Sequence, residues 1–91
     1  MPRYMVERTF PDGLGIPMNE AGARLCATVI SNNLAGGVTW IHSYVTPDRK
    51  KTFCIYDGPS PEAICQVAEK NGLPVDNIRE VRVFDPYFHR L

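Results

Sequence analysis

The fold is decided by a central stretch, Trp40-Ile41-His42-Ser43-Tyr44-Val45-Thr46-Pro47-Asp48-Arg49-Lys50-Lys51-Thr52-Phe53-Cys54-Ile55-Tyr56-Asp57. Residues 38–46 and 51–57 are rich in aromatic and β-branched side chains, which favour strands. The four residues between them begin with Pro-Asp, a pair typical of turns. The stretch therefore predicts two antiparallel strands joined as a hairpin.

Helix signals lie on both sides of this hairpin. Before it, Asn19 can accept hydrogen bonds from free amides, and apolar residues follow at helical spacing until Gly36. After it, Ser60-Pro61 places a capping hydroxyl before a proline, and the apolar stripe that follows ends at Asn71. We predict one helix behind Asn19 and a second, shorter helix behind Ser60.

Two outer strands complete the pattern, residues 3–9 before the first helix and residues 78–84 after the second. The order strand, helix, strand, strand, helix, strand is the split βαβ pattern. It predicts an α+β, ferredoxin-like domain spanning residues 1–91, with a four-stranded antiparallel sheet and both helices on one face.

Strand alternation then divides side chains between the helix face and the opposite face, which we call the open face. Residues predicted on the helix face are Val6, Ile41, Val45, Val81 and Val83. Residues predicted on the open face are Glu7, Trp40, His42, Tyr44, Glu80, Arg82 and Phe84. Large aromatic residues on an open face indicate an interface or a ligand groove, and a face-to-face homodimer would bury them. A β-bulge would exchange the faces of a hairpin strand.

Bulk composition narrows the function classes. Ten Lys and Arg residues balance ten Asp and Glu residues, so no net field attracts nucleic acid. No segment approaches the roughly 20 apolar residues of a membrane span, and no signal-peptide pattern opens the chain, so we expect a cytoplasmic protein with no membrane partner. The three cysteines have no metal-finger spacing and are expected to be reduced.

His42 is the most suggestive residue for chemistry, because an imidazole on the open face can bind a metal or move a proton near neutral pH. Cys54 and Glu7 are the further candidate metal ligands. Cysteine and histidine together suit zinc, nickel or copper, and Glu7 could orient the histidine or bind the cation. A metal-binding protein is the first hypothesis. The ordinary alternatives are an interface histidine, a glutamate paired with arginine and a buried cysteine.

A second hypothesis is an enzyme or binder of small apolar molecules, with a cavity between two sheets and His42 as the acid or base. Trp40, Tyr44 and Tyr56 are the candidate ligand-binding residues. A third is a structural module whose open face is only a dimer interface. His89 near the C-terminus is a weaker ligand candidate, because chain ends are mobile.

Several short motifs resemble a family of small bacterial ferredoxin-like proteins of unassigned function that includes nickel-binding proteins. They are Trp40-x-His42-Ser43-Tyr44, Cys54-x-Tyr56, Glu62-Ala63-Ile64, Gly72-Leu73-Pro74 and Ile78-x-Glu80-Val81. The resemblance runs over residues 2–85.

This resemblance implies a dimeric α/β barrel of two ferredoxin-like subunits and nickel as the cofactor. Carried onto this chain, it makes His42 the best-matched ligand. Relatives often have a histidine where this chain has Val67, so the resemblance does not supply a ligand from the second helix.

Overall fold

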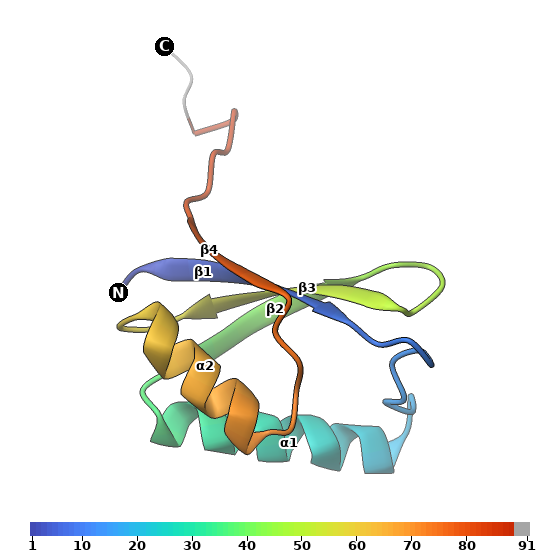
Figure 1. Cartoon of the computed structure of the whole chain (residues 1–91). Helices are drawn as coiled ribbons and strands as arrows, with labels where there is room; N and C mark the ends of the chain where they lie inside the picture. The colour runs from blue at the N-terminus through green and yellow to red at the C-terminus, as the bar shows by residue number, and fades with distance from the viewer. Residues whose placement is uncertain (89–91) are drawn as a thin grey trace.

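The computed structural model describes residues 1–88 and shows two helices packed on one face of a four-stranded sheet (Figure 1). The elements in chain order are β1 (Arg3–Thr9), α1 (Glu20–Ala35), β2 (Thr39–Val45), β3 (Lys51–Asp57), α2 (Pro61–Lys70) and β4 (Asn77–Val81). The strand order across the sheet is β2-β3-β1-β4, and all neighbouring strands are antiparallel. The predicted ferredoxin-like α+β fold is confirmed.

Local capping chemistry sets the helix boundaries as predicted. The Asn19 side chain accepts a hydrogen bond from the Gly22 amide at 3.2 Å, and the Ser60 hydroxyl accepts one from the Ala63 amide at 3.2 Å. These bonds satisfy amides that have no partner inside the helix. Behind α2, Gly72 adopts a positive φ of 69°, a conformation that glycine reaches without steric cost.

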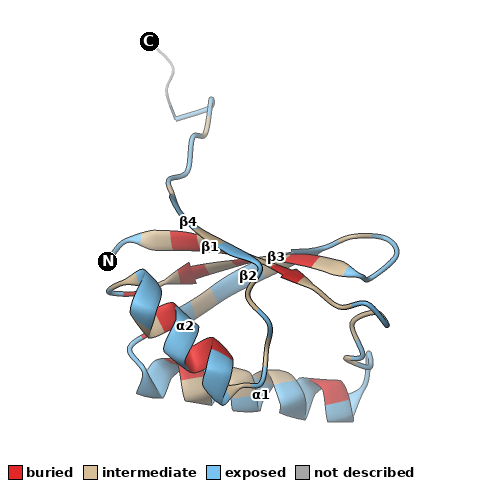
Figure 2. Ribbon diagram, viewed as in Figure 1, coloured by how far each residue is buried: buried red, intermediate tan, exposed pale blue. Residues whose placement is uncertain are grey.

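The hydrophobic core lies between the sheet and α2. Its buried residues are Tyr4, Val6, Val38, Cys54, Tyr56, Ile64 and Val67. Figure 2 shows buried positions on the two central strands, β1 and β3, and on α2; Val38 lies just before β2. Because alternate residues of β1 and β3 are buried, the sheet has one face covered and one face open.

Helix α1 covers the sheet less completely than α2. Only Gly22 and Asn33 are buried along its length. Its contact with the end of α2 is polar: Asn71 Nδ2 donates to Asn33 Oδ1 at 3.0 Å, and Asn32 Nδ2 donates to Asn71 Oδ1 at 2.7 Å. Space remains between α1 and the sheet, where residues of both line a cavity described below.

A β-bulge in β2 corrects part of the predicted face assignment. Trp40 lies opposite Tyr56 and His42 lies opposite Ile55, so Ile41 is the extra residue between them. Trp40 therefore lies on the helix face, where it packs against the core, and its Nε1 donates to Ser43 Oγ at 2.8 Å. The predictions that Trp40 is on the open face and Ile41 inside are wrong, because one inserted residue reverses the alternation.

The last strand is shorter than predicted and has the opposite parity. Ile78 lies opposite Val6 and packs on the core, so alternation places Glu80 on the helix face and Val81 on the open face. The predictions for these two residues are wrong. The strand ends at Val81 because its partner β1 begins at Arg3.

Residues 82–88 run away from the sheet on the side opposite the helices (Figure 1). Val83 and Phe84, predicted as strand residues, are 69% and 77% exposed and lie outside β4, as does Arg82.

Candidate functional site

The open face carries His42 and Tyr44 at its β2 edge, as predicted. His42 Nε2 and the Tyr44 hydroxyl are hydrogen-bonded at 3.2 Å, and the two rings meet edge to face with centroids 5.1 Å apart. Both side chains are exposed. The bulge permits this arrangement, because it returns His42 to the open face after Trp40 has turned inward.

Glu7 also lies on the open face but belongs to a separate ion pair. Its Oε2 is 2.7 Å from Lys51 Nζ, and this contact raises the pKa of Lys51. Glu7 lies opposite Phe53 on β3, whereas His42 lies opposite Ile55. Strand β3 lies between the strands that carry the two candidates, so they are at least two strand spacings, about 10 Å, apart. Their positions along the strands also differ by two residues, which increases the distance. One chain does not bring Glu7 to His42.

Cys54 lies on the other side of the sheet from His42. It is buried in the core opposite Ser43 and Val6, with Sγ 3.7 Å from Thr52 Oγ1. Among residues 1–88 no three His, Cys, Asp or Glu side chains are grouped closely enough to hold a metal ion. The predicted ligands His42, Glu7 and Cys54 therefore do not form one site within a single chain, and His89 lies outside the described residues.

An apolar strip occupies the middle of the open face. Met5, Phe53 and Ile55 are half-buried there, with Tyr44 beside Phe53 at the β2 edge. The ion pair between Lys51 and Glu7 and the one between Arg3 and Asp57 lie toward the two ends of the strip. An apolar centre with a charged rim is the arrangement expected of an interface.

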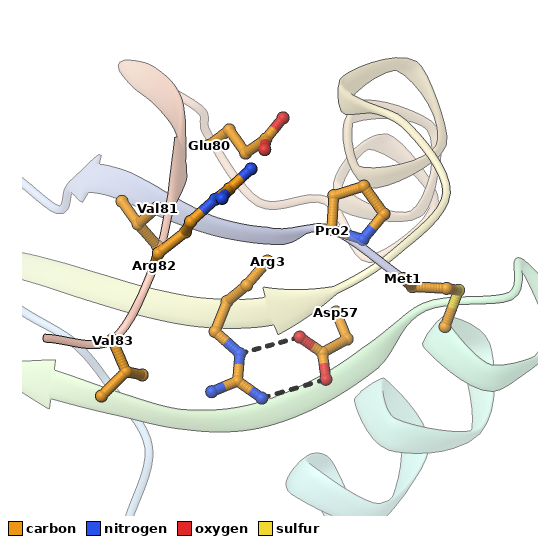
Figure 3. Close-up of a pocket in the computed structure, with 8 residues that line it drawn as sticks. All are labelled: Met1, Pro2, Arg3, Asp57, Glu80, Val81, Arg82 and Val83. Carbon is orange, nitrogen blue, oxygen red and sulfur yellow. Dashed lines mark hydrogen bonds and ion pairs between the residues drawn. The ribbon is translucent and has the colours of Figure 1, made fainter. Parts of the chain in front are cut away.

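A cavity with charged residues in its lining lies at one end of the sheet (Figure 3). This end cavity has a volume of about 470 Å³ and lies beside the N-terminus, the end of β3 and the chain leaving β4. Within it, the Arg3 guanidinium donates to both Asp57 carboxylate oxygens, at 2.8 and 3.1 Å. That pairing lowers the pKa of Asp57 and raises the pKa of Arg3. None of the predicted site residues lines this cavity.

Another cavity lies between the helix face of the sheet and α1, where the helix packs loosely. We call it the inner cavity; its volume is about 260 Å³. The sheet contributes Arg8, Trp40, Cys54 and Tyr56, α1 contributes Cys26 and Val29, and the β1–α1 loop contributes Phe10, Leu14 and Ile16. Two of the three predicted ligand-binding residues, Trp40 and Tyr56, thus meet here, and Tyr44 does not.

Sequence reasoning missed Arg8 as a component of this cavity. Its position in β1 could have indicated this, because Tyr4, Val6 and Arg8 are alternate residues that point to the same face of the sheet, and all three are buried. Arg8 Nη1 donates to the Tyr56 hydroxyl at 3.2 Å. Burial raises the pKa of Tyr56 to about 12, although the nearby Arg8 charge acts in the opposite direction.

Comparison with known proteins agrees with this fold. The chain is similar to a solved structure described as "Crystal structure analysis of SCO4226 from Streptomyces coelicolor A3(2)", with a TM-score of 0.72 and 20% sequence identity. The match covers 91% of this chain and 99% of that one, so it establishes the architecture. No curated protein matches the chain. None of the helices within the described residues is long and apolar enough to cross a membrane.

A family model covers nearly all of the folded part of the chain. It is described as "Nickel responsive protein SCO4226-like" and matches residues 4–81, from β1 to the end of β4. The matched segment includes the hairpin strand with His42 and both central strands. This chain belongs to the SCO4226-like family of nickel responsive proteins.

Proposed function

We propose that this protein binds nickel at the open face of the sheet, with His42 as a ligand and a second copy of the chain supplying the others. The observation that carries the proposal is the exposed imidazole of His42, fixed on the open face by the bulge and by Tyr44. The name of the family, which describes nickel responsive proteins, supports the choice of metal. Imidazole nitrogen is a preferred ligand of divalent nickel.

The need for a second copy follows from the shortage of ligands in one chain. The described residues hold no three-ligand group, and Glu7 is separated from His42 by β3. A two-fold dimer formed through the open faces would place two His42 side chains in the same interface. The apolar strip of Met5, Phe53 and Ile55 provides the surface that such a dimer would bury.

Glu7 is the carboxylate proposed to join His42 across this interface. It would have to exchange its Lys51 partner for the metal. That exchange is energetically modest, because the pair is partly exposed and exposed ion pairs contribute little. Cys54 is not part of the proposed site, because it is buried on the helix face.

The Tyr44 hydroxyl is proposed to orient the imidazole. A hydrogen bond to one ring nitrogen fixes which nitrogen is presented to a metal. With Nε2 held by Tyr44 at 3.2 Å, Nδ1 is the nitrogen left for coordination. Tyr44→Phe removes this hydrogen bond and keeps the ring, so it is expected to weaken nickel binding without abolishing it.

The test is calorimetric titration of reduced, tag-free protein with nickel chloride and, separately, zinc chloride. We expect micromolar or tighter binding of two nickel ions per dimer, because two-fold symmetry repeats the pairing of His42 with the partner's Glu7. His42→Ala should bind at least about tenfold more weakly. His89→Ala is the matched control, because it removes the other histidine of the chain and should leave the affinity unchanged. Light scattering checks that each variant remains a dimer.

Three outcomes would overturn the proposal: no nickel binding by the wild type, equal affinity in His42→Ala, or loss of binding in His89→Ala alone. A monomer that binds one nickel per chain would refute the shared site while leaving His42 as a ligand to be tested by the same variant.

A further inference from the structure

Arg8 is a buried cation without an anionic partner. It is 2% exposed, and its Nη1 donates a hydrogen bond to the Tyr56 hydroxyl at 3.2 Å. The guanidinium also lies over the Tyr56 ring, with Cζ 5.6 Å from the centroid. Its Nε has no hydrogen-bond acceptor, and the ion pairs found among residues 1–88 involve other residues.

This arrangement is unusual because a buried charge is costly unless it is paired and hydrogen-bonded. A tyrosine ring and a neutral hydroxyl compensate an arginine only in part. An anion beside Nε would satisfy the missing bond and neutralise the charge together. The edge formed by Nε and a terminal nitrogen is one that planar carboxylates bind with two parallel hydrogen bonds.

Arg8 lines the inner cavity, which supplies the space for such an anion. Because Nε itself is enclosed, the guanidinium must turn toward the cavity to bind it. Apart from Arg8, every residue that lines the cavity is uncharged, and most are apolar or aromatic, including Trp40, Val29 and Leu14. A single cation in an apolar chamber matches a monoanion better than a doubly charged phosphate. Its volume of about 260 Å³ sets the size of the occupant. Since a cavity of about 150 Å³ accommodates benzene, this one accommodates roughly ten non-hydrogen atoms.

The β1–α1 loop covers the cavity and is held in place by the hairpin turn. Arg49 donates to the carbonyl oxygens of Leu14 and Ile16, at 3.2 and 3.1 Å. Both of these loop residues line the cavity. An apolar tail running from Arg8 toward α1 would lie against these two residues.

We propose that the inner cavity binds a small apolar monocarboxylate, whose carboxylate accepts hydrogen bonds from Arg8 and whose hydrocarbon part lies between Trp40 and α1. This site is on the opposite face of the sheet from His42 and uses none of the residues proposed for nickel. Its occupant belongs to the class of medium-chain or aryl-substituted carboxylic acids.

The test compares octanoate with 1-octanol, which has the same chain without the charge, in calorimetric titrations without added metal. We expect the wild type to bind octanoate, and Arg8→Met to bind it at least about tenfold more weakly. Octanol affinity should change much less in this variant. Arg79→Met is the matched control: it removes an exposed arginine from β4, on the open face, and should bind octanoate like the wild type.

Val29→Phe provides a second test that leaves Arg8 in place. Phenylalanine at this half-buried position of α1 fills the cavity from the helix side, so octanoate and octanol should both lose affinity. Circular dichroism checks that the variants are folded. Equal octanoate affinity in the wild type and Arg8→Met, unchanged affinity in Val29→Phe, or no octanoate binding up to about 5 mM would overturn the proposal.

Discussion

Replacing Gly22 with alanine tests how the β1–α1 loop sits on the first turn of α1. Gly22 is buried, and a Cβ at this position would lie 1.7 Å from the Pro17 carbonyl oxygen and 2.9 Å from its carbonyl carbon. The oxygen would have to retreat by about 1.3 Å or more to reach even a tight contact distance. The obstacle is backbone, so rotation of a side chain does not relieve it.

Two opposing effects set the magnitude. Alanine favours a helix over glycine by about 1 kcal/mol. Against this, forced movement in a packed region costs about 1–3 kcal/mol. Movement of the loop also threatens the cap in which Asn19 accepts from the Gly22 amide, a bond of about 1 kcal/mol. Proline has a fixed φ, and Arg49 anchors the neighbouring Ile16 carbonyl, so the loop yields poorly. We expect Gly22→Ala to lower the free energy of unfolding by about 2 kcal/mol, and Tm by roughly 10 °C.

Chemical denaturation followed by circular dichroism measures this change. Gly15→Ala is the control in the same loop, because an added Cβ there meets no atom within 4 Å. It should be neutral or stabilise by up to about 1 kcal/mol. If Gly22→Ala is as stable as the wild type, the loop does not pack on α1 in this way. The loop would then not cover the inner cavity as described.

Three further predictions concern stability. Ser60→Ala removes the hydroxyl that accepts from the Ala63 amide, so it should lower the free energy of unfolding by about 1 kcal/mol in urea titrations, whereas Ser60→Gly should change it by only a few tenths. Burial raises the pKa of Tyr56 to about 12 and so favours its neutral form in the folded state. The stability that this residue contributes should be complete below pH 10 and should fall between pH 10 and about 12. Denaturation midpoints measured across that range should fall less in Tyr56→Phe than in the wild type. Arg3 lowers the pKa of Asp57 below 3.8 in the folded state. The stability that this ion pair contributes should therefore be complete above pH 3.8 and disappear as the pH falls through the lower folded pKa. Equal loss of stability in acid by the wild type and Asp57→Asn would contradict this.

The order of elements was predictable because each boundary is encoded by local chemistry. Asn19 and Ser60 each accept a hydrogen bond from an amide three residues later, so the sequence pattern that predicts each cap is equally short. The hairpin turn is similarly local, since Asp48 accepts from the Thr46 hydroxyl at 2.7 Å and from the Lys50 amide at 3.0 Å. Signals of this range can be found in a single sequence without knowledge of the tertiary contacts.

The faces of the edge strands were less predictable because they depend on partners distant in sequence. The bulge at Ile41 is visible only when Trp40 and His42 are paired with β3. Likewise, the pairing of Ile78 with Val6 decides which residues of β4 face the helices. The alternation of valine with charged residues after Ile78 predicted the opposite faces. One residue of offset moves every later side chain to the other face, so such errors carry over directly into the candidate site.

The sheet itself explains why the candidate residues separate into two groups. On β3, Phe53 and Ile55 face outward while Cys54 and Tyr56 face inward. The same strands therefore contribute residues to the open face around His42 and to the inner cavity around Arg8, but no side chain belongs to both sites. Coupling between them would require a change in the strands that both faces share, because side chains cannot reach through the backbone layer. The nickel and carboxylate proposals thus stand or fall independently: loss of nickel binding in His42→Ala bears on the open face alone, and loss of octanoate binding in Arg8→Met bears on the inner cavity alone.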